Sequence, residues 1–254
     1  MATCTDKYKY GLCSISFRSL SPREIVTLVK DAGLDCIEWG SDVHAKPDDE
    51  HELLEIVRLQ NESGIYCSSY GTYFRIGQDP VDDIYKYIKA AKTLGTDTLR
   101  LWCGAKGSAD YTEDERKAVI NDCKALSRIA EKENVYLCLE CHIKTLTDDM
   151  NSTLSLMSEV NSKNFIMYWQ PNQFKTVEEN ILYAKSISDK TKCIHVFNWK
   201  EKEKYPLADG KSVWQNYLAC FGANTLLLEF MPDGDPNSLK REAISLFEIT
   251  GKQK

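Results

Sequence analysis

The stretch Tyr10–Gly33, YGLCSISFRSLSPREIVTLVKDAG, contains one strand–helix unit and distinguishes between two folds. Its apolar run Tyr10–Phe17 is typical of a buried strand. Ser21-Pro22-Arg23-Glu24 then forms a capping box with proline in the first turn, and Gly33 ends the predicted helix. An open, doubly wound sheet usually has a glycine-rich phosphate turn after its first strand. Residues 17–21 read Phe-Arg-Ser-Leu-Ser, without glycine, so this unit favours a closed barrel.

The same alternation of strand and helix recurs along the whole chain. Another helix is predicted to begin at Asp79-Pro80 and to end at Gly95, and Thr112 with Glu115 forms a second capping box. Eight such units in about 250 residues are what a (β/α)8 barrel requires. Since no linker or shift in composition divides the chain, we predict one α/β domain over residues 1–254. The eight predicted strands are Tyr10–Phe17, Cys36–Trp39, Ile65–Tyr70, Thr98–Trp102, Val135–His142, Phe165–Gln170, Cys193–Trp199 and Leu226–Phe230.

The charge of the chain limits its partners. Its 38 acidic and 32 basic side chains give a formal charge of −6, whereas nucleic acids and anionic membranes require a basic face. No apolar run approaches the roughly 20 residues of a membrane span, and the N-terminal sequence does not resemble a signal peptide. Ten cysteines in such a chain favour reduced thiols. We therefore expect a cytoplasmic protein that acts on a small molecule, with a homo-oligomeric state left open.

Three titratable side chains end apolar runs that otherwise resemble buried strands. Glu140 follows Cys-Leu, His195 follows Cys-Ile, and Glu229 follows three leucines. A buried carboxylate costs several kcal/mol unless it is paired or binds a metal, and a structural ion pair explains any one of these residues. Because the C-terminal strand ends of a (β/α)8 barrel surround its active site, three such residues in one chain favour a bound divalent cation.

The whole chain resembles the xylose isomerase-like TIM barrels, a superfamily of sugar isomerases, epimerases and related enzymes. Segments that carry the resemblance are Arg100–Ser108 (RLWCGAKGS), Tyr168–Pro171 (YWQP) and His195–Trp199 (HVFNW). Members often bind one divalent metal ion through Glu, Asp, His and Glu on the fifth to eighth strands. The resemblance therefore implies one Mn²⁺, Mg²⁺ or Zn²⁺ ion held by Glu140, Gln170, His195 and Glu229.

Gln170 departs from this family pattern. Where members commonly have Asp, and His three residues later, this chain has Gln170 and Gln173. An amide oxygen can still bind a hard cation, but the ligands then carry two negative charges instead of three, which weakens capture of the ion. Gln170 is either a neutral fourth ligand or a sign that the metal has been lost.

The resemblance implies metal-assisted isomerisation or epimerisation of a small sugar or polyol derivative. Glu140 and Glu229, on opposite sides of the substrate, would exchange a carbon-bound proton through an enediolate whose charge the metal ion stabilises. The predicted substrate-binding residues, which all lie at or beyond strand ends, are Trp39, Tyr70, Arg75, Trp102, His142, Gln173 and Asn198.

Two other functions remain open. Glu140–Asp148, ECHIKTLTD, is similar to the E-x-H-x-x-T-L-x-D segment of dehydroshikimate dehydratases, which implies a metal-dependent lyase. The chain lacks the Asp and His of the sixth strand that usually accompany that segment. The third alternative is a barrel that binds carbohydrate without catalysis.

Four of the five tryptophans, Trp39, Trp102, Trp169 and Trp199, lie at predicted strand ends. Core packing explains any one of them, whereas four around one mouth favour stacking on the apolar faces of a sugar ring. The polar segment Lys200–Lys211 follows the last of these tryptophans and is either a lid or a solvated surface loop.

Overall fold

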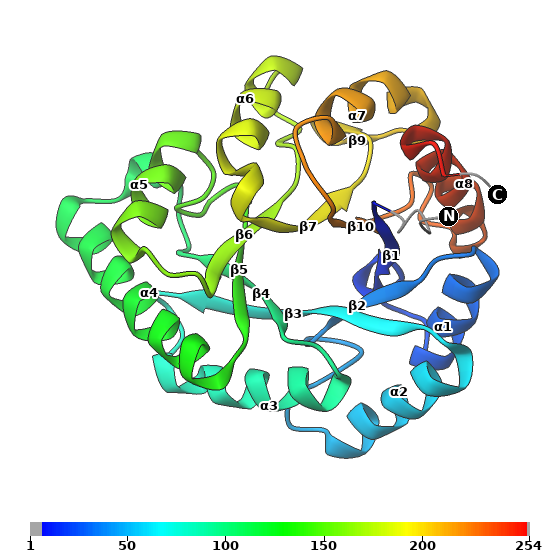
Figure 1. Ribbon diagram of the computed structural model, residues 1–254, viewed down its shortest axis with the longest axis horizontal. Helices are drawn as coiled ribbons and strands as arrows, with labels where there is room; N and C mark the ends of the chain where they lie inside the picture. Colours follow the sequence, from blue (N-terminus) through cyan, green and yellow to red (C-terminus); the bar gives the residue numbers. More distant parts are fainter. Residues whose placement is uncertain (1–6, 253–254) are drawn as a thin grey trace, which may run out of the picture.

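The computed structural model of the protein describes residues 7–252. Within that range, eight parallel strands close into a barrel in the order β1-β10-β7-β6-β5-β4-β3-β2, and the helices form a ring outside it (Figure 1). The predicted (β/α)8 fold is confirmed. The barrel strands are β1 (Lys9–Cys13), β2 (Cys36–Gly40), β3 (Tyr66–Ile76), β4 (Thr98–Cys103), β5 (Tyr136–Glu140), β6 (Phe165–Trp169), β7 (Thr191–Val196) and β10 (Thr225–Leu228).

The predicted helix signals are confirmed at both ends of several helices. Ser21 and Thr112 each accept a hydrogen bond from the backbone N–H of the glutamate three residues later, in complete capping boxes. Gly95 ends its helix with a left-handed φ of 84°, a conformation that glycine adopts without steric cost. Within residues 7–252 no helix has the length and apolarity needed to cross a membrane. The α-helices are α1 (Pro22–Asp31), α2 (Glu50–Ser63), α3 (Ile84–Leu94), α4 (Glu113–Glu133), α5 (Met150–Val160), α6 (Val177–Ile187), α7 (Lys211–Leu218) and α8 (Leu239–Thr250).

The strand boundaries differ from the predicted ones most at the C-terminal ends of β1 and β3, and one predicted loop contains a hairpin. Residues Ser14–Phe17 form a 3-10 helix instead of the end of β1, because the Ser14 hydroxyl accepts a hydrogen bond from Gly40 N at 2.9 Å. β3 continues to Ile76 through an irregular pairing with β4. The expected loop at Lys200 is in part an antiparallel hairpin of β8 (Trp199–Lys200) and β9 (Glu203–Lys204).

The interior of the barrel is built in layers. Cys36, Cys138, Tyr168, Cys193 and Leu227 form one buried hydrophobic cluster. Because strand side chains alternate between faces, the residue two positions later on each strand points to the same interior, one layer higher. Those residues belong to the polar layer at the C-terminal ends of the strands, where (β/α)8 enzymes have their active sites. The side chains of this polar layer are Glu38, Glu140, Gln170, His195 and Glu229.

Candidate active site

Nitrogen Nδ1 of His195 is the point on which the predicted metal ligands converge. It lies 3.1 Å from Gln170 Oε1, 3.5 Å from Glu229 Oε2 and 3.7 Å from Glu140 Oε1. Two ligands that share one ion through bonds of about 2.1 Å lie roughly 3 to 3.6 Å apart. The distances to Gln170 and Glu229 lie in that range and the distance to Glu140 lies just beyond it. The four predicted ligands thus meet at one nitrogen and could hold a divalent cation.

Arg100, on β4, gives the two carboxylate oxygens of Glu140 different surroundings. Its guanidinium pairs with Glu140 Oε2, which also accepts a hydrogen bond from Trp102 Nε1, whereas Oε1 faces His195. Although burial opposes ionisation, the Arg100 guanidinium holds the pKa of Glu140 well below its usual range. Glu140 is therefore a fixed, ionised group with one oxygen available to a ligand.

Sequence analysis did not assign Glu38, on β2, to the site. Its carboxylate is fully buried, with Oε1 3.0 Å from Arg100 Nε and 3.4 Å from His195 Nε2. The signal was present in the sequence, since Glu38 follows the apolar pair Cys36-Ile37 just as Glu140 follows Cys-Leu. Its partners could not be identified there, because only barrel closure brings β2, β4 and β7 around one interior.

The charges of the site are unbalanced without a further cation. Three carboxylates face one guanidinium, which leaves an excess of negative charge beside a neutral imidazole. Burial disfavours the charged His195 ring, but the carboxylates of Glu229 and Glu38 outweigh it and raise the pKa of His195 well above its usual value. Burial also raises the pKa of Glu229. A proton on His195 offsets one of the two excess negative charges, whereas a divalent metal ion would offset both.

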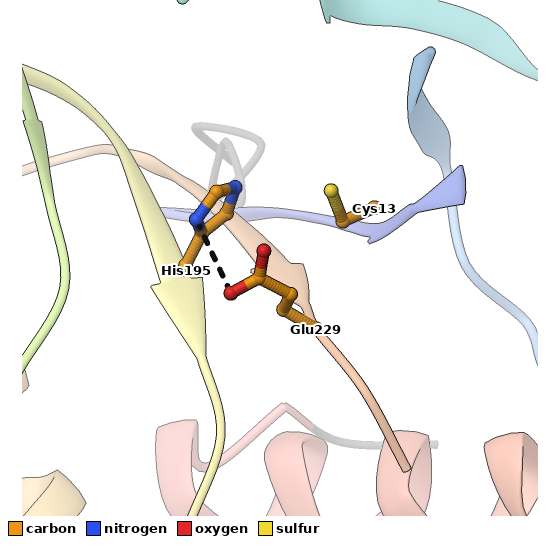
Figure 2. A group of neighbouring side chains, drawn as sticks. All are labelled: Cys13, His195 and Glu229. Carbon is orange, nitrogen blue, oxygen red and sulfur yellow. Dashed lines mark ion pairs between the residues drawn. The ribbon is translucent and has the colours of Figure 1, made fainter. Parts of the chain in front are cut away.

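A second group of side chains could also hold a metal ion. Cys13, His195 and Glu229 each bring one ligand atom within 4.8 Å of the others (Figure 2). The Cys13 thiol donates to Glu38 Oε1 at 3.0 Å, and burial raises the pKa of that thiol well above its usual value. Because the thiolate is the ligand form of cysteine, this group would bind a metal ion only with loss of the thiol proton.

A cavity of about 220 Å³ lies above the polar layer. It is smaller than the roughly 300 to 1,000 Å³ that drug-sized ligands occupy, so it fits a small substrate. Of the predicted substrate-binding residues, Trp102, His142 and Gln173 line it, together with the proposed ligands Glu140, Gln170 and Glu229. Its other lining residues are Ile15, Tyr73, Arg100, Cys141, Ile143, Pro171, Asn172, Phe197, Trp199 and Phe230.

Three aromatic residues expected at this cavity face away from it. Trp39 follows inward-facing Glu38, so strand alternation directs its indole toward α2, where Nε1 donates to Gln60 Oε1 at 2.9 Å. The Tyr70 hydroxyl donates to a backbone carbonyl 2.6 Å away in the fully buried core. Trp169 packs against aromatic rings in and after α7. The predicted mouth of four tryptophans is therefore wrong, and only Trp102 and Trp199 line the cavity.

Two predicted polar contacts also lie outside the cavity lining. The Arg75 guanidinium stacks over the Trp102 ring at 4.0 Å and donates to Gly104 O at 3.3 Å. Asn198 Nδ2 donates to Pro206 O at 2.9 Å and so fixes the segment after the hairpin. Neither side chain therefore lines the cavity, and the contact of either one with a substrate stays a prediction.

The β8–β9 hairpin forms one side of the cavity mouth. Trp199 packs between Phe197 and Phe230, with ring centroids 4.9 and 5.6 Å away. The ammonium group of Lys204 lies 4.9 Å from the Trp199 ring centroid and 5.0 Å from that of Phe230. At the tip, Glu201 N donates to the backbone carbonyl of the cavity-lining Gln173. The segment Lys200–Lys211, predicted to be a lid or a surface loop, thus begins in the hairpin that forms part of the cavity wall.

A closed parallel barrel with such a polar cluster at its C-terminal strand ends is the architecture of (β/α)8 enzymes. Residues 26–223 match the profile of the xylose isomerase-like TIM barrel family, and the chain belongs to that family. It is 30% identical over 179 residues to the 3-dehydroshikimate dehydratase of Bacillus anthracis. That match covers 64% of this chain and 63% of the relative, so it spans less than two thirds of the relative's length.

Solved structures show the same fold at lower identity. The "probable 3-DHS dehydratase AsbF" of Bacillus anthracis superposes with a TM-score of 0.81 and 20% identity, over 94% of this chain and 98% of that one. The IolI protein with a bound zinc atom superposes with a TM-score of 0.76 and 16% identity, over 96% and 98% of the two chains.

Proposed function

We propose that the protein is a metal-assisted enzyme that removes a proton from the carbon next to a carbonyl group in a small hydroxylated substrate. The observation that carries this proposal is the convergence of Gln170, Glu140 and Glu229 on His195 Nδ1, beneath a small cavity. These four residues would hold the ion. When bound, a divalent cation supplies a Lewis acid that polarises the carbonyl.

Glu229 is the base in this proposal. It lines the cavity, and within residues 7–252 its carboxylate has one ion-pair partner, the His195 ring. Burial raises its pKa, which strengthens it as a proton acceptor. Glu140, held by Arg100 and Trp102 with a lowered pKa, is the weaker base and acts mainly as a ligand.

The difference in basicity between Glu229 and Glu140 favours elimination of water, because this reaction needs only one base, together with one acid. Glu229 would take the carbon-bound proton, and His142, on the same cavity, would give a proton to the departing hydroxyl group. Dehydration is also the activity of the Bacillus anthracis relative, whose name gives 3-dehydroshikimate as substrate. The similar segment Glu140–Asp148 shapes the site, since Thr147 Oγ1 donates to Glu140 O and Ser108 N donates to Asp148.

Isomerisation or epimerisation through an enediolate is the second candidate. It is supported by the position of both Glu140 and Glu229 on one cavity, where each could reach the same substrate carbon from a different side. This chemistry requires Glu140 to act as a second base in spite of its pairing with Arg100.

One set of assays separates the candidates. The Mn²⁺-loaded protein is incubated with 3-dehydroshikimate, whose loss of water gives an aromatic ring that absorbs in the near ultraviolet, and separately with ketohexoses in D2O. We expect the aromatic product, abolished in Glu229→Gln and retained in Glu203→Gln, a change in the exposed hairpin. Deuterium uptake by a ketohexose, lost in both Glu140→Gln and Glu229→Gln, would establish the second candidate instead. Turnover that survives in Glu229→Gln contradicts both.

A further inference from the structure

We propose that Glu38 is a positioning residue for His195: its carboxylate accepts a hydrogen bond from Nε2 of the ring and thereby keeps Nδ1 directed at the ligand oxygens. The inference rests on the proposed metal site. It concerns the side of His195 opposite to Gln170, Glu140 and Glu229.

The two nitrogens of the His195 ring have different surroundings. Nδ1 faces the three oxygens that would share an ion with it. Nε2 is buried and has no hydrogen-bond partner within residues 7–252, although Glu38 Oε1 lies 3.4 Å away. A histidine that binds a metal through one nitrogen usually donates the other N–H to a carboxylate, a carbonyl or water. Glu38 is the carboxylate placed for that role, and a small approach of the two atoms completes the bond.

Glu38 is itself held in place. Oε1 accepts from Arg100 Nε and from the Cys13 thiol, each at 3.0 Å, and Oε2 accepts from Ser69 Oγ at 3.1 Å. Gly71 permits this close packing, because a Cβ atom there would lie 2.7 Å from Arg100 Nη2 and 3.1 Å from Glu38 Oε1. A carboxylate fixed from three sides can fix the ring in turn.

The charge of Glu38 matters as well as its position. Arg100 lies among the residues around the proposed ion and would repel a divalent cation. Glu38 offsets that positive charge from below, while Glu140 keeps one oxygen for the ion. Replacing Glu38 by glutamine retains the shape but removes the charge, so we expect the site to bind a cation more weakly.

The test compares Glu38→Gln with Ser69→Ala, which removes the contact at the other oxygen, Oε2, and leaves the side facing His195 intact. Mn²⁺ and Zn²⁺ are titrated into each folded protein at fixed pH and salt. We expect the affinity to fall roughly 10- to 100-fold in Glu38→Gln, the effect typical of partners behind metal ligands, and less than about threefold in Ser69→Ala. Equal affinities in Glu38→Gln and wild type overturn the inference, and so does an equal loss in both variants.

A spectroscopic measurement on the wild type tests the same point without substitution. In the ¹⁵N-labelled, Zn²⁺-loaded protein, we expect the ion on Nδ1 of His195 and a slowly exchanging proton on Nε2. Zinc on Nε2, or a rapidly exchanging Nε2 proton, overturns the role of Glu38 even where metal binding is intact. A wild-type protein that takes up neither metal contradicts the proposed function itself, and the inference with it.

Discussion

The amide oxygen of Gln170 lies 3.1 Å from Nδ1 of His195. Strand alternation explains this contact, because Gln170 follows the inward-facing Tyr168 by two positions at the end of β6. The carboxamides after this strand are therefore not equivalent. Gln170 faces the proposed ion, whereas Asn172 accepts a hydrogen bond from Phe174 N in the following loop.

Gln170→Asp should tighten Mn²⁺ binding by about tenfold, because it adds a full negative charge next to a divalent ion in a partly dehydrated site. The aspartate side chain is one carbon shorter, which offsets part of the electrostatic gain. Gln173→Asp is the matched control, since Gln173 lines the cavity but lies outside the group of oxygens around His195 Nδ1. Titration of Mn²⁺ into the three proteins measures the effect, and equal dissociation constants for Gln170→Asp and wild type would remove Gln170 from the ligand set.

His195→Ala should abolish metal uptake, because His195 contributes the nitrogen around which the other ligands gather. The wild-type protein is expected to retain roughly one divalent ion per chain after dialysis against Mn²⁺. His51→Ala is the control, because His51 is exposed on α2. Metal analysis of the dialysed proteins decides: stoichiometric metal in His195→Ala places the ion elsewhere.

Metal uptake should release a proton and strengthen as pH rises. Burial opposes a charged His195, but Glu229 and Glu38 raise the pKa of the metal-free ring well above its usual value, which favours the protonated ring. An ion that binds the neutral ring must displace that proton. Below the raised pKa, the association constant for Mn²⁺ should therefore increase about tenfold per pH unit and level off above it. Calorimetric titrations in buffers of different ionisation enthalpy count the released protons, and a pH-independent constant without proton release contradicts the assignment.

Period-two alternation and strand order were sufficient to predict the barrel, and the family resemblance supplied the four proposed ligands whose side chains the barrel brings together. The sequence was less informative about which way the side chains near the strand ends point. Trp39 and Tyr70 were expected at the cavity for their residue type, yet each immediately follows an inward-facing residue, Glu38 or Ser69, and must face outward. The pairing of Glu38 with Arg100 joins residues 62 positions apart on strands that are not neighbours, so only the closed barrel reveals it.

The last prediction concerns the charge of the substrate. Arg100 is the one arginine or lysine among the described residues that line the cavity, and it is already engaged by Glu38 and Glu140. The ammonium group of Lys204 lies over the cavity-lining rings of Trp199 and Phe230, and within the described chain no carboxylate pairs with it. Lys204 is therefore a cation placed beside the cavity mouth, where it could meet a carboxylate on a substrate such as 3-dehydroshikimate.

Lys204→Met should raise KM for a carboxylate-bearing substrate about five- to tenfold, the loss expected for one charge-assisted contact, and should change kcat little because Lys204 is not part of the cluster around His195. Methionine preserves an unbranched chain over the two rings. Lys202→Met, a change of the same kind at the exposed tip of the hairpin, is the matched control and should leave KM unchanged. Steady-state kinetics at low and high salt provide the measurement. Salt screens the contact between charges, so high salt should raise the KM of the wild type toward that of the variant. An equal rise in KM for both variants would mean that the hairpin acts through general charge, and an unchanged KM in Lys204→Met would remove Lys204 from substrate binding.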